Sequence, residues 1–391
     1  MRPPRDAAEV APDGQTPGAV TGLRVGIDAT PLLGARTGVG KYVEHLTNAL
    51  IGRPGLAELR ATAFTWRGQH ELRESVPAGA SVAGRRAPAR GLQEAWARQE
   101  FPPVELLTGD VDVFHGTNFV LPPLRRSAGV VTVHDLAYLR LPETVHAASL
   151  RYRELVPRSL RRATLVLTPT RAVGEEIIDA YHLGADRVVV TPLGVHQRWF
   201  AVSPPDPGWL DARGLPPQYL LAVGTLEPRK GLDVLITAYR RLLAEEPEVP
   251  PLVLVGGSGW GERPDVAAVP AGRVVLPGYL TDDDLTRVVA GARLLAFPSR
   301  YEGFGLPPLE AMAAGVPVVA SDLPAVREAT SGLVRLVPPN DPDALAAALA
   351  TELHDMPDPG RTEAARAHAA TQTWQRCAEL TMQAYRTAAR G

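Results

Sequence analysis

Short apolar runs alternate with longer amphipathic stretches along most of this chain, and the alternation begins twice. Residues 23–27 are a predicted buried strand, followed by a glycine-rich turn at 34–40 and an amphipathic helix through about Leu50. After a stretch with five prolines at residues 203–217, the pattern restarts with a strand at 219–223 and a helix at 232–244. Apolar strands in alternation with helices are typical of parallel sheets covered on both faces. We therefore predict an α/β protein with two doubly wound domains.

The remaining predicted elements follow the same alternation. In the first half, strands are expected at residues 61–66, 111–114, 130–133, 164–167 and 188–190, and helices near 91–99, 146–161 and 171–181. In the second half, strands are expected at 252–255, 274–276, 294–297 and 316–320, and helices at 282–290, 309–314 and from 341 to the end, broken near 357–360. Ligands of open parallel sheets lie at the carboxyl ends of the strands, so two facing domains predict a ligand between them.

Length and composition set the expected boundaries. At about 150 residues per domain, 391 residues predict two domains, at 22–200 and 218–371, with the proline-rich stretch 201–217 as their linker. Residues 1–21 are polar and rich in Pro, Gly and Ala, which predicts a disordered tail. The closing segment, 372–391, is predicted to be helical.

Charge and cysteine content exclude several classes of protein. The net charge is −2, so no nucleic-acid partner is expected. The single cysteine, Cys377, allows neither an internal disulfide nor a thiolate zinc site, which fits a reducing compartment. No run approaches the roughly 18 apolar residues of a membrane-spanning helix, and the first residues lack the apolar core of a secretory signal. We expect a cytoplasmic protein, and the sequence predicts no cofactor.

The most informative segment, residues 298–310, reads Pro-Ser-Arg-Tyr-Glu-Gly-Phe-Gly-Leu-Pro-Pro-Leu-Glu between a predicted strand and a predicted helix. Two glycines let the backbone approach a ligand, and the prolines fit a first helical turn. The helix start offers free N–H groups to a phosphate. Glu302 and Glu310 bracket this turn, and because carboxylates repel phosphate, sugar hydroxyls are their expected targets. The alternative is that Glu310 complements the helix dipole and Glu302 is a solvated loop residue.

This segment resembles the Glu-x7-Glu motif of retaining glycosyltransferases with the GT-B fold, in the large family four. The resemblance extends through residues 312–321 and covers nearly the whole chain from about Leu23. It implies that Glu310 binds the nucleotide ribose and that Glu302 lies near the donor sugar. It also implies that the amides of Phe304, Gly305 and Leu306 face the sugar and the phosphates.

The resemblance also implies an architecture. Two Rossmann-like domains face each other across a cleft, with the acceptor on the N-terminal domain and the nucleotide sugar on the C-terminal domain. The last helix, which contains Trp374, crosses back and packs on the N-terminal domain.

A second motif, Gly224-Thr225-Leu226-Glu227-Pro228-Arg229-Lys230-Gly231, follows the strand that opens the second half. Two adjacent cations before a helix suit a diphosphate leaving group, and arginine can bind it through two parallel hydrogen bonds. The alternative is a basic surface loop. In the family resembled, an Arg after the strand and a Lys five residues later hold the diphosphate. Lys230 matches the Lys, Thr225 stands at the Arg position, and Arg229 is its expected replacement, as in a subgroup rich in GDP-mannose-dependent mannosyltransferases.

Two further motifs lie in the first half. Thr37-Gly38-Val39-Gly40-Lys41-Tyr42 is similar to the first glycine loop of the family, where Gly38 to Gly40 approach the phosphate and sugar of the donor. His134 and Asp135 end a predicted strand, and no Gly-x-Ser-x-Gly elbow accompanies them to make a hydrolytic triad. The resemblance implies that His134 contacts the donor sugar. His115, one strand earlier, is a weaker candidate for the acceptor side.

Several other features have plainer interpretations. Asp110-Val111-Asp112 matches the Asp-x-Asp of metal-dependent transferases, but it precedes a buried strand, so no metal site is predicted. Residues 282–284, three aspartates, fit an acidic first helical turn. Five arginines make the helix at 146–162 basic, and it is either a solvated face or a peripheral contact with the inner face of a membrane.

The expected activity is metal-independent, retaining transfer of a hexose, with mannose from GDP-mannose preferred and UDP-hexose second. The acceptor is a saccharide, a lipid-linked glycan or a small metabolite. The alternatives are a GT-B sugar-nucleotide epimerase, a silent sugar-nucleotide-binding homologue and, as a poor fourth, a nicotinamide dehydrogenase, for which the Gly-x-Gly-x-x-Gly fingerprint is incomplete. Base selection is expected near Leu276. The predicted catalytic residues are His134, Arg229, Lys230 and Glu302, and the predicted donor-binding residues are Gly38, Val39, Gly40, Asp135, Gly224, Thr225, Gly278, Tyr279, Phe304, Gly305, Leu306 and Glu310.

Overall fold

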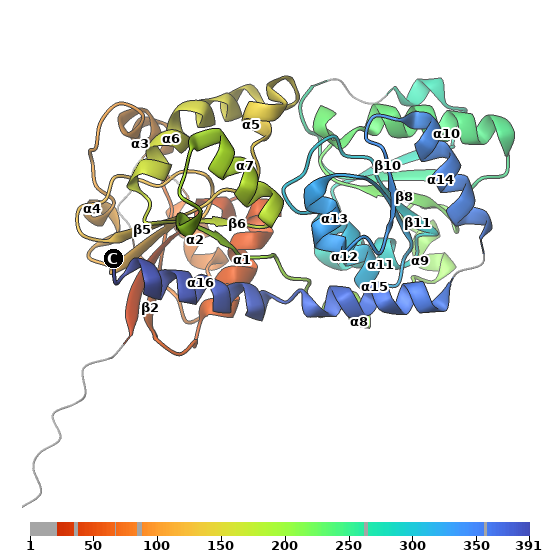
Figure 1. Cartoon of the computed structure of the whole chain (residues 1–391). Coiled ribbons are helices and arrows are strands. Elements are labelled where there is room, and N and C mark those ends of the chain that lie inside the picture. Colours follow the sequence, from red (N-terminus) through yellow and green to blue (C-terminus); the bar gives the residue numbers. More distant parts are fainter. Residues whose placement is uncertain (1–21, 35–37, 67, 84–87, 262–264, 356–357) are drawn as a thin grey trace, which may run out of the picture.

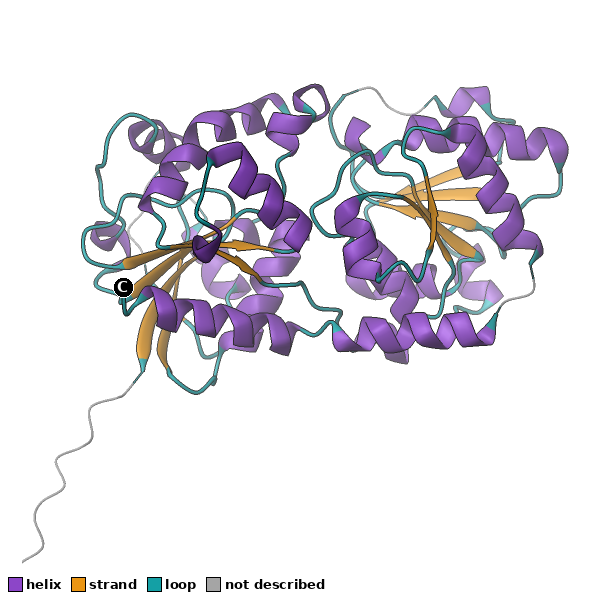
Figure 2. Cartoon of the chain, viewed as in Figure 1, coloured by secondary structure: helices purple, strands orange, loops and turns teal. Residues whose placement is uncertain are grey.

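The computed structural model describes residues 22–34, 38–66, 68–83, 88–261, 265–355 and 358–391. The predicted tail at 1–21 lies outside the described residues, as does Thr37 of the first glycine loop. The described residues form two lobes, each built around one sheet with helices on both of its faces (Figure 1, Figure 2).

The first lobe contains a seven-stranded parallel sheet with the order β3-β2-β1-β4-β5-β6-β7. Its strands are β1 Leu23–Asp28, β2 Leu56–Thr62, β3 Ser81–Val82, β4 Val113–Gly116, β5 Ala128–Thr132, β6 Leu165–Thr168 and β7 Val188–Val190. Its α-helices are α1 Gly38–Leu50, α2 Gln69–Ser75, α3 Ala89–Trp96, α4 Glu105–Thr108, α5 Ala137–Arg140, α6 Tyr152–Arg162 and α7 Arg171–Tyr181.

The second lobe contains a six-stranded parallel sheet with the order β10-β9-β8-β11-β12-β13. Its strands are β8 Leu220–Val223, β9 Leu252–Val255, β10 Val274–Gly278, β11 Leu294–Phe297, β12 Val318–Ser321 and β13 Arg335–Val337. The remaining α-helices are α8 Arg198–Ala201, α9 Pro207–Asp211, α10 Leu232–Glu245, α11 Asp282–Ala290, α12 Leu306–Ala313, α13 Pro324–Thr330, α14 Pro342–His354, α15 Pro359–Thr371 and α16 Trp374–Ala388.

Burial on both faces explains why the central strands are apolar throughout. In β11, Leu295 and Phe297 pack with α12, while Leu294 and Ala296 belong to the cluster that contains α10 and α14. Successive side chains of a strand point to opposite faces, so a strand covered by helices on both sides needs apolar residues at every position. The predicted pair of doubly wound, Rossmann-like sheets is therefore confirmed.

The chain passes between the lobes twice, and the two passages lie side by side. Val195 N–H donates a hydrogen bond to the Gln372 carbonyl at 2.8 Å. Helix α15 ends in the second lobe, and α16 follows it back to pack on α1 in the first (Figure 1). The predicted return of the last helix is confirmed as part of this GT-B architecture.

Two predicted element boundaries are wrong for identifiable reasons. The strand expected at 61–66 is β2, which ends at Thr62 because it pairs with β1 in parallel up to Asp28. The apolar residues that follow leave the sheet, and Ala63 and Phe64 are buried in the core from a loop. Helix α12 begins at Leu306 rather than residue 309, because the two prolines occupy its first turn.

Candidate active site between the two domains

The loop between β11 and α12 brings the Glu-x7-Glu segment to the boundary between the two lobes. Gly303 lies against the first lobe so closely that a Cβ there would meet the His134 carbonyl oxygen at 1.8 Å. Its own carbonyl accepts a hydrogen bond from Thr170 Oγ1 at 3.0 Å. Only glycine allows this approach, because every other residue would place a Cβ inside the contact.

The strongest charge cluster of this interdomain site surrounds Glu302. Lys230 Nζ donates to Glu302 Oε1 at 2.6 Å, and Arg229 Nη1 donates to Oε2 at 3.1 Å. Ser299 Oγ donates to Oε1 at 2.7 Å, and the Glu302 side chain is 10% exposed. Burial opposes ionisation, but the two cations outweigh it and lower the pKa of Glu302 to about 2. The two cations for which the sequence predicts a diphosphate partner thus contact Glu302 directly.

Arg229 makes a second ion pair on the side away from Glu302. Its Nη2 and Nε lie 2.7 Å and 3.0 Å from Oε1 of Glu227, and Nη1 also donates to the Tyr301 carbonyl at 3.1 Å. Glu227 is buried, and burial raises its pKa. With Lys230 and Glu302, the cluster contains two positive and two negative side chains. A diphosphate that binds the two cations must therefore compete with Glu302.

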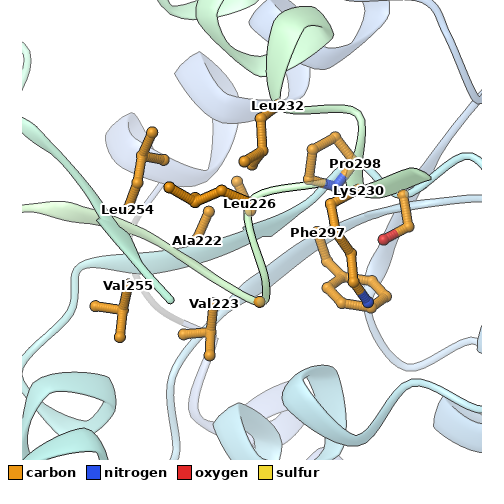
Figure 3. Close-up of a pocket in the computed structure, with 12 residues that line it drawn as sticks. Ala222, Val223, Leu226, Lys230, Leu232, Leu254, Val255, Phe297 and Pro298 are labelled. Carbon is orange, nitrogen blue, oxygen red and sulfur yellow. The ribbon is translucent and has the colours of Figure 1, made fainter. Parts of the chain in front are cut away.

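The side chain of Lys230 passes the end of β11 to reach Glu302. In Figure 3 its aliphatic stem runs beside the ring of Phe297, and Nζ lies 5.5 Å from the centroid of that ring. Under it is a cavity of about 10 Å³, lined by Gly224 among others, which is room for about one water molecule. This cavity borders Lys230 and is too small for a ligand.

Glu310 lies one helical turn into α12 and is half-buried. Burial raises its pKa to about 7, and the carboxylate of Asp282 adds to the rise. The cations Lys41 and Arg198 oppose it. A carboxyl group that titrates near neutral pH at a boundary between domains is typical of a functional site.

His134 follows β5 and is held by a hydrogen bond rather than by a charge. Its Nε2 lies 2.8 Å from the Thr117 carbonyl oxygen, which only accepts, so Nε2 carries a proton. Burial lowers the pKa of His134, and the neutral ring then has Nδ1 as its acceptor. Asp135 beside it accepts a hydrogen bond from Ala137 N–H at 2.9 Å.

The other predicted site residues take several positions. Gly38, Val39 and Gly40 form the first turn of α1, and Gly305 is the N-cap of α12 with a φ of 112°. Phe304 is buried, so it offers its backbone rather than its ring. The remaining predicted donor-binding residues lie at or next to strand ends of the second sheet or at the start of α12: Gly224, Thr225, Gly278, Tyr279 and Leu306.

His115 does not line the acceptor side as expected. It is fully buried, with Nδ1 2.7 Å from the Tyr385 hydroxyl and Nε2 2.7 Å from Thr132 Oγ1. Burial lowers its pKa to about 3, so the ring is neutral and joins α16 to the first sheet. Its role is structural.

The features with plainer interpretations keep them. Asp112 forms an ion pair with Arg24 at 2.7 Å, and no group of three or more His, Cys, Asp or Glu side chains placed to hold a metal occurs among the described residues. Thr281 caps α11, whose first turn carries the three aspartates. Trp374 is buried against Tyr42 and His45. Across the described parts of the chain, the structure has no helix that is both long and apolar enough to span a membrane.

Two cross-domain contacts were missed by sequence reasoning. Tyr301 accepts a hydrogen bond from Leu136 N–H at 3.0 Å and donates to Glu176 at 2.6 Å. Lys41 forms an ion pair with Asp282 at 2.9 Å. Each pairs residues more than a hundred positions apart, so periodicity could not reveal either. The available signal was the presence of Tyr301 and Lys41 inside the two glycine-containing motifs.

A larger hollow than the cavity beside Lys230 lies elsewhere. It has a volume of about 700 Å³ and is lined by residues at the amino ends of β12 and β13, including Pro317, Val318 and Val334. Because ligands of open parallel sheets bind at the carboxyl ends of strands, we do not place the donor there.

Comparison with known proteins defines the class of this fold and site. Residues 217–355 match the family described as "Glycosyl transferases group 1", and residues 37–194 match the "Glycosyl transferase 4-like domain". The chain is 34% identical over 304 residues to O-antigen chain mannosyltransferase B of Escherichia coli, covering 75% of this chain and 77% of that protein. The chain therefore belongs to the group 1 glycosyltransferase family, and it is a glycosyltransferase.

Two further similarities are more limited in what they show. The chain is 28% identical over 215 residues to serotype-specific mannosyltransferase WbdA of Escherichia coli, covering 51% of this chain but only 26% of that longer protein. The solved structure of sucrose-phosphate synthase from Thermosynechococcus elongatus has a TM-score of 0.68 at 22% identity, covering 93% of this chain and 98% of that chain. The second similarity supports the GT-B fold alone.

Proposed function

We propose that this protein transfers mannose from GDP-mannose to a hydroxyl group of a saccharide, with retention at the anomeric carbon. The observation that carries the donor class is the convergence of Lys230 and Arg229 on one buried carboxylate beside the start of α12. Two cations and a helix N-terminus together suit a nucleoside diphosphate. The mannose preference is supported by the name of the 34% identical relative and by the Glu-Pro-Arg-Lys sequence at 227–230.

The roles of the residues follow from their positions. The diphosphate takes the place of Glu302 beside Lys230 and Arg229, and the displaced carboxylate turns to the sugar hydroxyls. The amides at the start of α12, from Phe304 to Leu306, receive phosphate oxygens, and Glu310 accepts hydrogen bonds from the ribose.

The N-terminal domain completes the donor site in this proposal. The backbone carbonyl of His134 lies against Gly303, next to the Glu-x7-Glu segment. We therefore propose that the His134 ring contacts the sugar. Gly38 to Gly40 leave room for the phosphate and sugar at the start of α1.

The reaction is a front-face substitution. The bond between the sugar C1 and the diphosphate oxygen breaks, and a C1–O bond to the acceptor forms on the same face through an oxocarbenium-like state. The leaving phosphate oxygen takes the proton of the acceptor hydroxyl. Lys230, Arg229 and the α12 N-terminus stabilise the negative charge that develops on the diphosphate. In this mechanism the two cationic side chains and the α12 N-terminus together stabilise the leaving group.

The domain limits 22–200 and 218–371 are part of the proposal, with the acceptor on the first domain. Residues 201–217 include the short helix α9 and contribute Leu210 and Leu215 to the core. We propose a cytoplasmic protein whose acceptor is free or lipid-linked.

Helix α6 and the turn before it contribute less to a membrane contact than the sequence implies. Arg153 donates to the Tyr138 carbonyl, Arg162 pairs with Glu100, and Arg151 donates to Gln93. We therefore propose that contact with anionic lipid, if the acceptor is lipid-linked, depends on Arg158 and Arg161. Sedimentation with anionic and zwitterionic vesicles tests this, and equal binding by the double variant Arg158→Ala/Arg161→Ala would contradict it.

The first experiment is a thermal-shift screen of nucleotide sugars, followed by turnover on free and lipid-linked acceptors. Release of nucleoside diphosphate only when both donor and acceptor are present supports transfer. Conversion of the donor into a different sugar nucleotide without acceptor supports the alternative, a GT-B epimerase that handles the same donor. Binding without turnover supports a silent homologue.

Donor choice needs a separate measurement, because the phosphate-binding residues do not read the base. Leu276 and Tyr279 are exposed at 44% and 58% where β10 ends, and they are the proposed base contacts together with Gly278. Calorimetry with GDP and UDP decides between the donors. Tighter binding of UDP by about tenfold, or 1.4 kcal/mol, replaces GDP-mannose by UDP-hexose and leaves the reaction class unchanged.

A further inference from the structure

One ion pair of the interdomain site joins the glycine loop of the first domain to the nucleotide side of the second. Lys41 Nζ lies 2.9 Å from Oδ1 of Asp282, with side-chain exposures of 19% and 38%. Lys41 directly follows Gly40 in α1, and Asp282 is the first residue of α11. A partly buried pair between two domains forms only where both domains meet, so it reports on their closure.

The same lysine acts on Glu310. Among the groups that shift the pKa of Glu310, Lys41 exerts the largest favourable effect on its charged form, after the opposing effect of burial. Reciprocally, the charges of Glu310 and Asp282 raise the pKa of Lys41 against the effect of burial. Lys41 therefore carries its full positive charge next to two carboxyl groups, one of which titrates near neutral pH.

The other charged and polar groups around Glu310 are few. Helix α11 contributes Asp282, which disfavours the charged form, and α8 contributes Arg198 and the Trp199 side chain, which favour it. Arg198 is divided between two aspartates, at 3.7 Å from Asp282 and 3.6 Å from Asp283.

Helix α15 also packs on α12 but directs its cation elsewhere. Arg366 donates to the Ala313 carbonyl at 2.6 Å, at the carboxyl end of α12. Lys41 is thus the cation that α1 supplies to Glu310.

We propose that Lys41 is a positioning residue for Glu310: held by Asp282 across the domain boundary, its ammonium favours the ionised form of the Glu310 carboxylate, which accepts from the ribose hydroxyls. The proposal rests on the proposed function, in which Glu310 binds the ribose. An ionised carboxylate accepts hydrogen bonds on both oxygens, whereas a protonated one has to donate from one of them. Two neighbouring ribose hydroxyls can both donate only to the ionised form.

This arrangement makes nucleotide binding depend on domain closure. When the domains separate, Lys41 leaves with α1, while Glu310 and Asp282 remain together in the second domain. Burial and the neighbouring aspartate then favour the protonated form of Glu310. The nucleoside is therefore held most tightly when the first domain is in place, and its release is favoured as the domains open.

The test is the affinity of GDP and UDP, measured by calorimetry at pH 7.0 and pH 9.0 for the wild type and single variants. Lys41→Gln should weaken binding of the better nucleotide about tenfold at pH 7.0. At pH 9.0, where Glu310 ionises without Lys41, the nucleotide affinity of Lys41→Gln should be within about threefold of the wild-type affinity. Lys41→Arg should bind like the wild type at both pH values. Arg240→Gln is the matched control, since it also removes one cation but from an exposed position on α10, and it should change the nucleotide affinity at neither pH.

The outcomes separate this inference from the proposed function. Equal weakening of Lys41→Gln at both pH values, or no weakening at either, would overturn the positioning role. Glu310→Gln provides the second comparison, and in its background Lys41→Gln should have no further effect. If Glu310→Gln binds nucleotide like the wild type, the ribose assignment itself is wrong. If Glu310→Gln weakens binding and Lys41→Gln does not, only the role of Lys41 is wrong.

Discussion

The two halves of the interdomain site differ in how they are built. The C-terminal half contributes a tight charge cluster, in which Lys230 and Arg229 share the Glu302 carboxylate. The N-terminal half contributes a neutral histidine, held through Nε2 by a backbone carbonyl, and a glycine loop at the start of α1. Helix α1 adds one cation at the boundary, Lys41, which pairs with Asp282 at the nucleotide side of the second domain.

This difference indicates a division of labour. The charged half suits a diphosphate, whose affinity comes from electrostatics, and the neutral half suits a sugar, whose recognition depends on shape and hydrogen bonds. It also means that substitutions in the two halves should have different signatures. Those in the C-terminal half should alter nucleotide binding and stability. Those in the N-terminal half, with the exception of Lys41, should alter transfer with little change in nucleotide affinity.

The largest effect is expected for Lys230→Ala. Loss of one stabilising cation should raise the barrier by about 2–4 kcal/mol, which is a loss of roughly 30- to 1,000-fold in kcat. Turnover at saturating donor is the measurement, and Arg240→Ala, an exposed position on α10, is the control. Wild-type turnover in Lys230→Ala would mean that Lys230 serves only to neutralise Glu302.

The next effect concerns stability without ligand. Glu302→Gln leaves two neighbouring cations without their shared counter-charge, and removing one partner of a buried ion pair costs about 3 kcal/mol. The melting temperature should therefore fall by several degrees. The deficit should shrink when saturating nucleoside diphosphate is added, because its phosphates replace the missing negative charge. A deficit that is unchanged by nucleotide would contradict the proposed displacement of Glu302.

The charged half should also be sensitive to acid. The folded-state pKa of Glu302, about 2, lies below its unfolded value of about 4.3, so the unfolded state binds more protons between these values. The contribution is complete above about pH 4.3 and is lost as the pH falls toward 2, to a limit of about 3 kcal/mol. Denaturant unfolding from pH 5 to pH 2.5 should show a shallower decline in Glu302→Gln than in the wild type.

A smaller and different effect is expected in the neutral half. His134→Ala removes one hydrogen bond to the sugar, worth about 1 kcal/mol, so kcat/KM should fall about fivefold. Calorimetry with the bare nucleoside diphosphate should give an unchanged Kd. A parallel loss in nucleotide affinity would remove the distinction between the two halves.

The smallest effect is expected outside both halves. Asp110→Ala should retain turnover within about twofold, and activity should survive excess chelator, because the side chains already described neutralise the leaving group. Complete loss in chelator, restored by magnesium or manganese, would return Asp110 and Asp112 to consideration.

The class of fold and most of the candidate site could be predicted from the sequence because both depend on local patterns. Apolar strands alternating with helices specify parallel sheets, and segment 298–310 specifies a glycine-containing loop between a strand and a helix. The exact end of β2 could not be predicted, because pairing with β1 decides where the strand stops. His115 was likewise misread, since its burial depends on Tyr385 from the last helix.

The sequence by itself determined which residue types stand at the strand ends, because motif and spacing are local. The tertiary structure decided which of them meet. Lys230 and Glu302 lie 72 residues apart in sequence, and Lys41 and Asp282 lie still farther apart, so their pairing depends on how the sheets and domains are packed. The same packing decides protonation, since burial and neighbouring charge lower the pKa of Glu302 to about 2 and raise that of Glu310 to about 7. Two carboxyl groups of one motif thus differ in pKa because they have different neighbours.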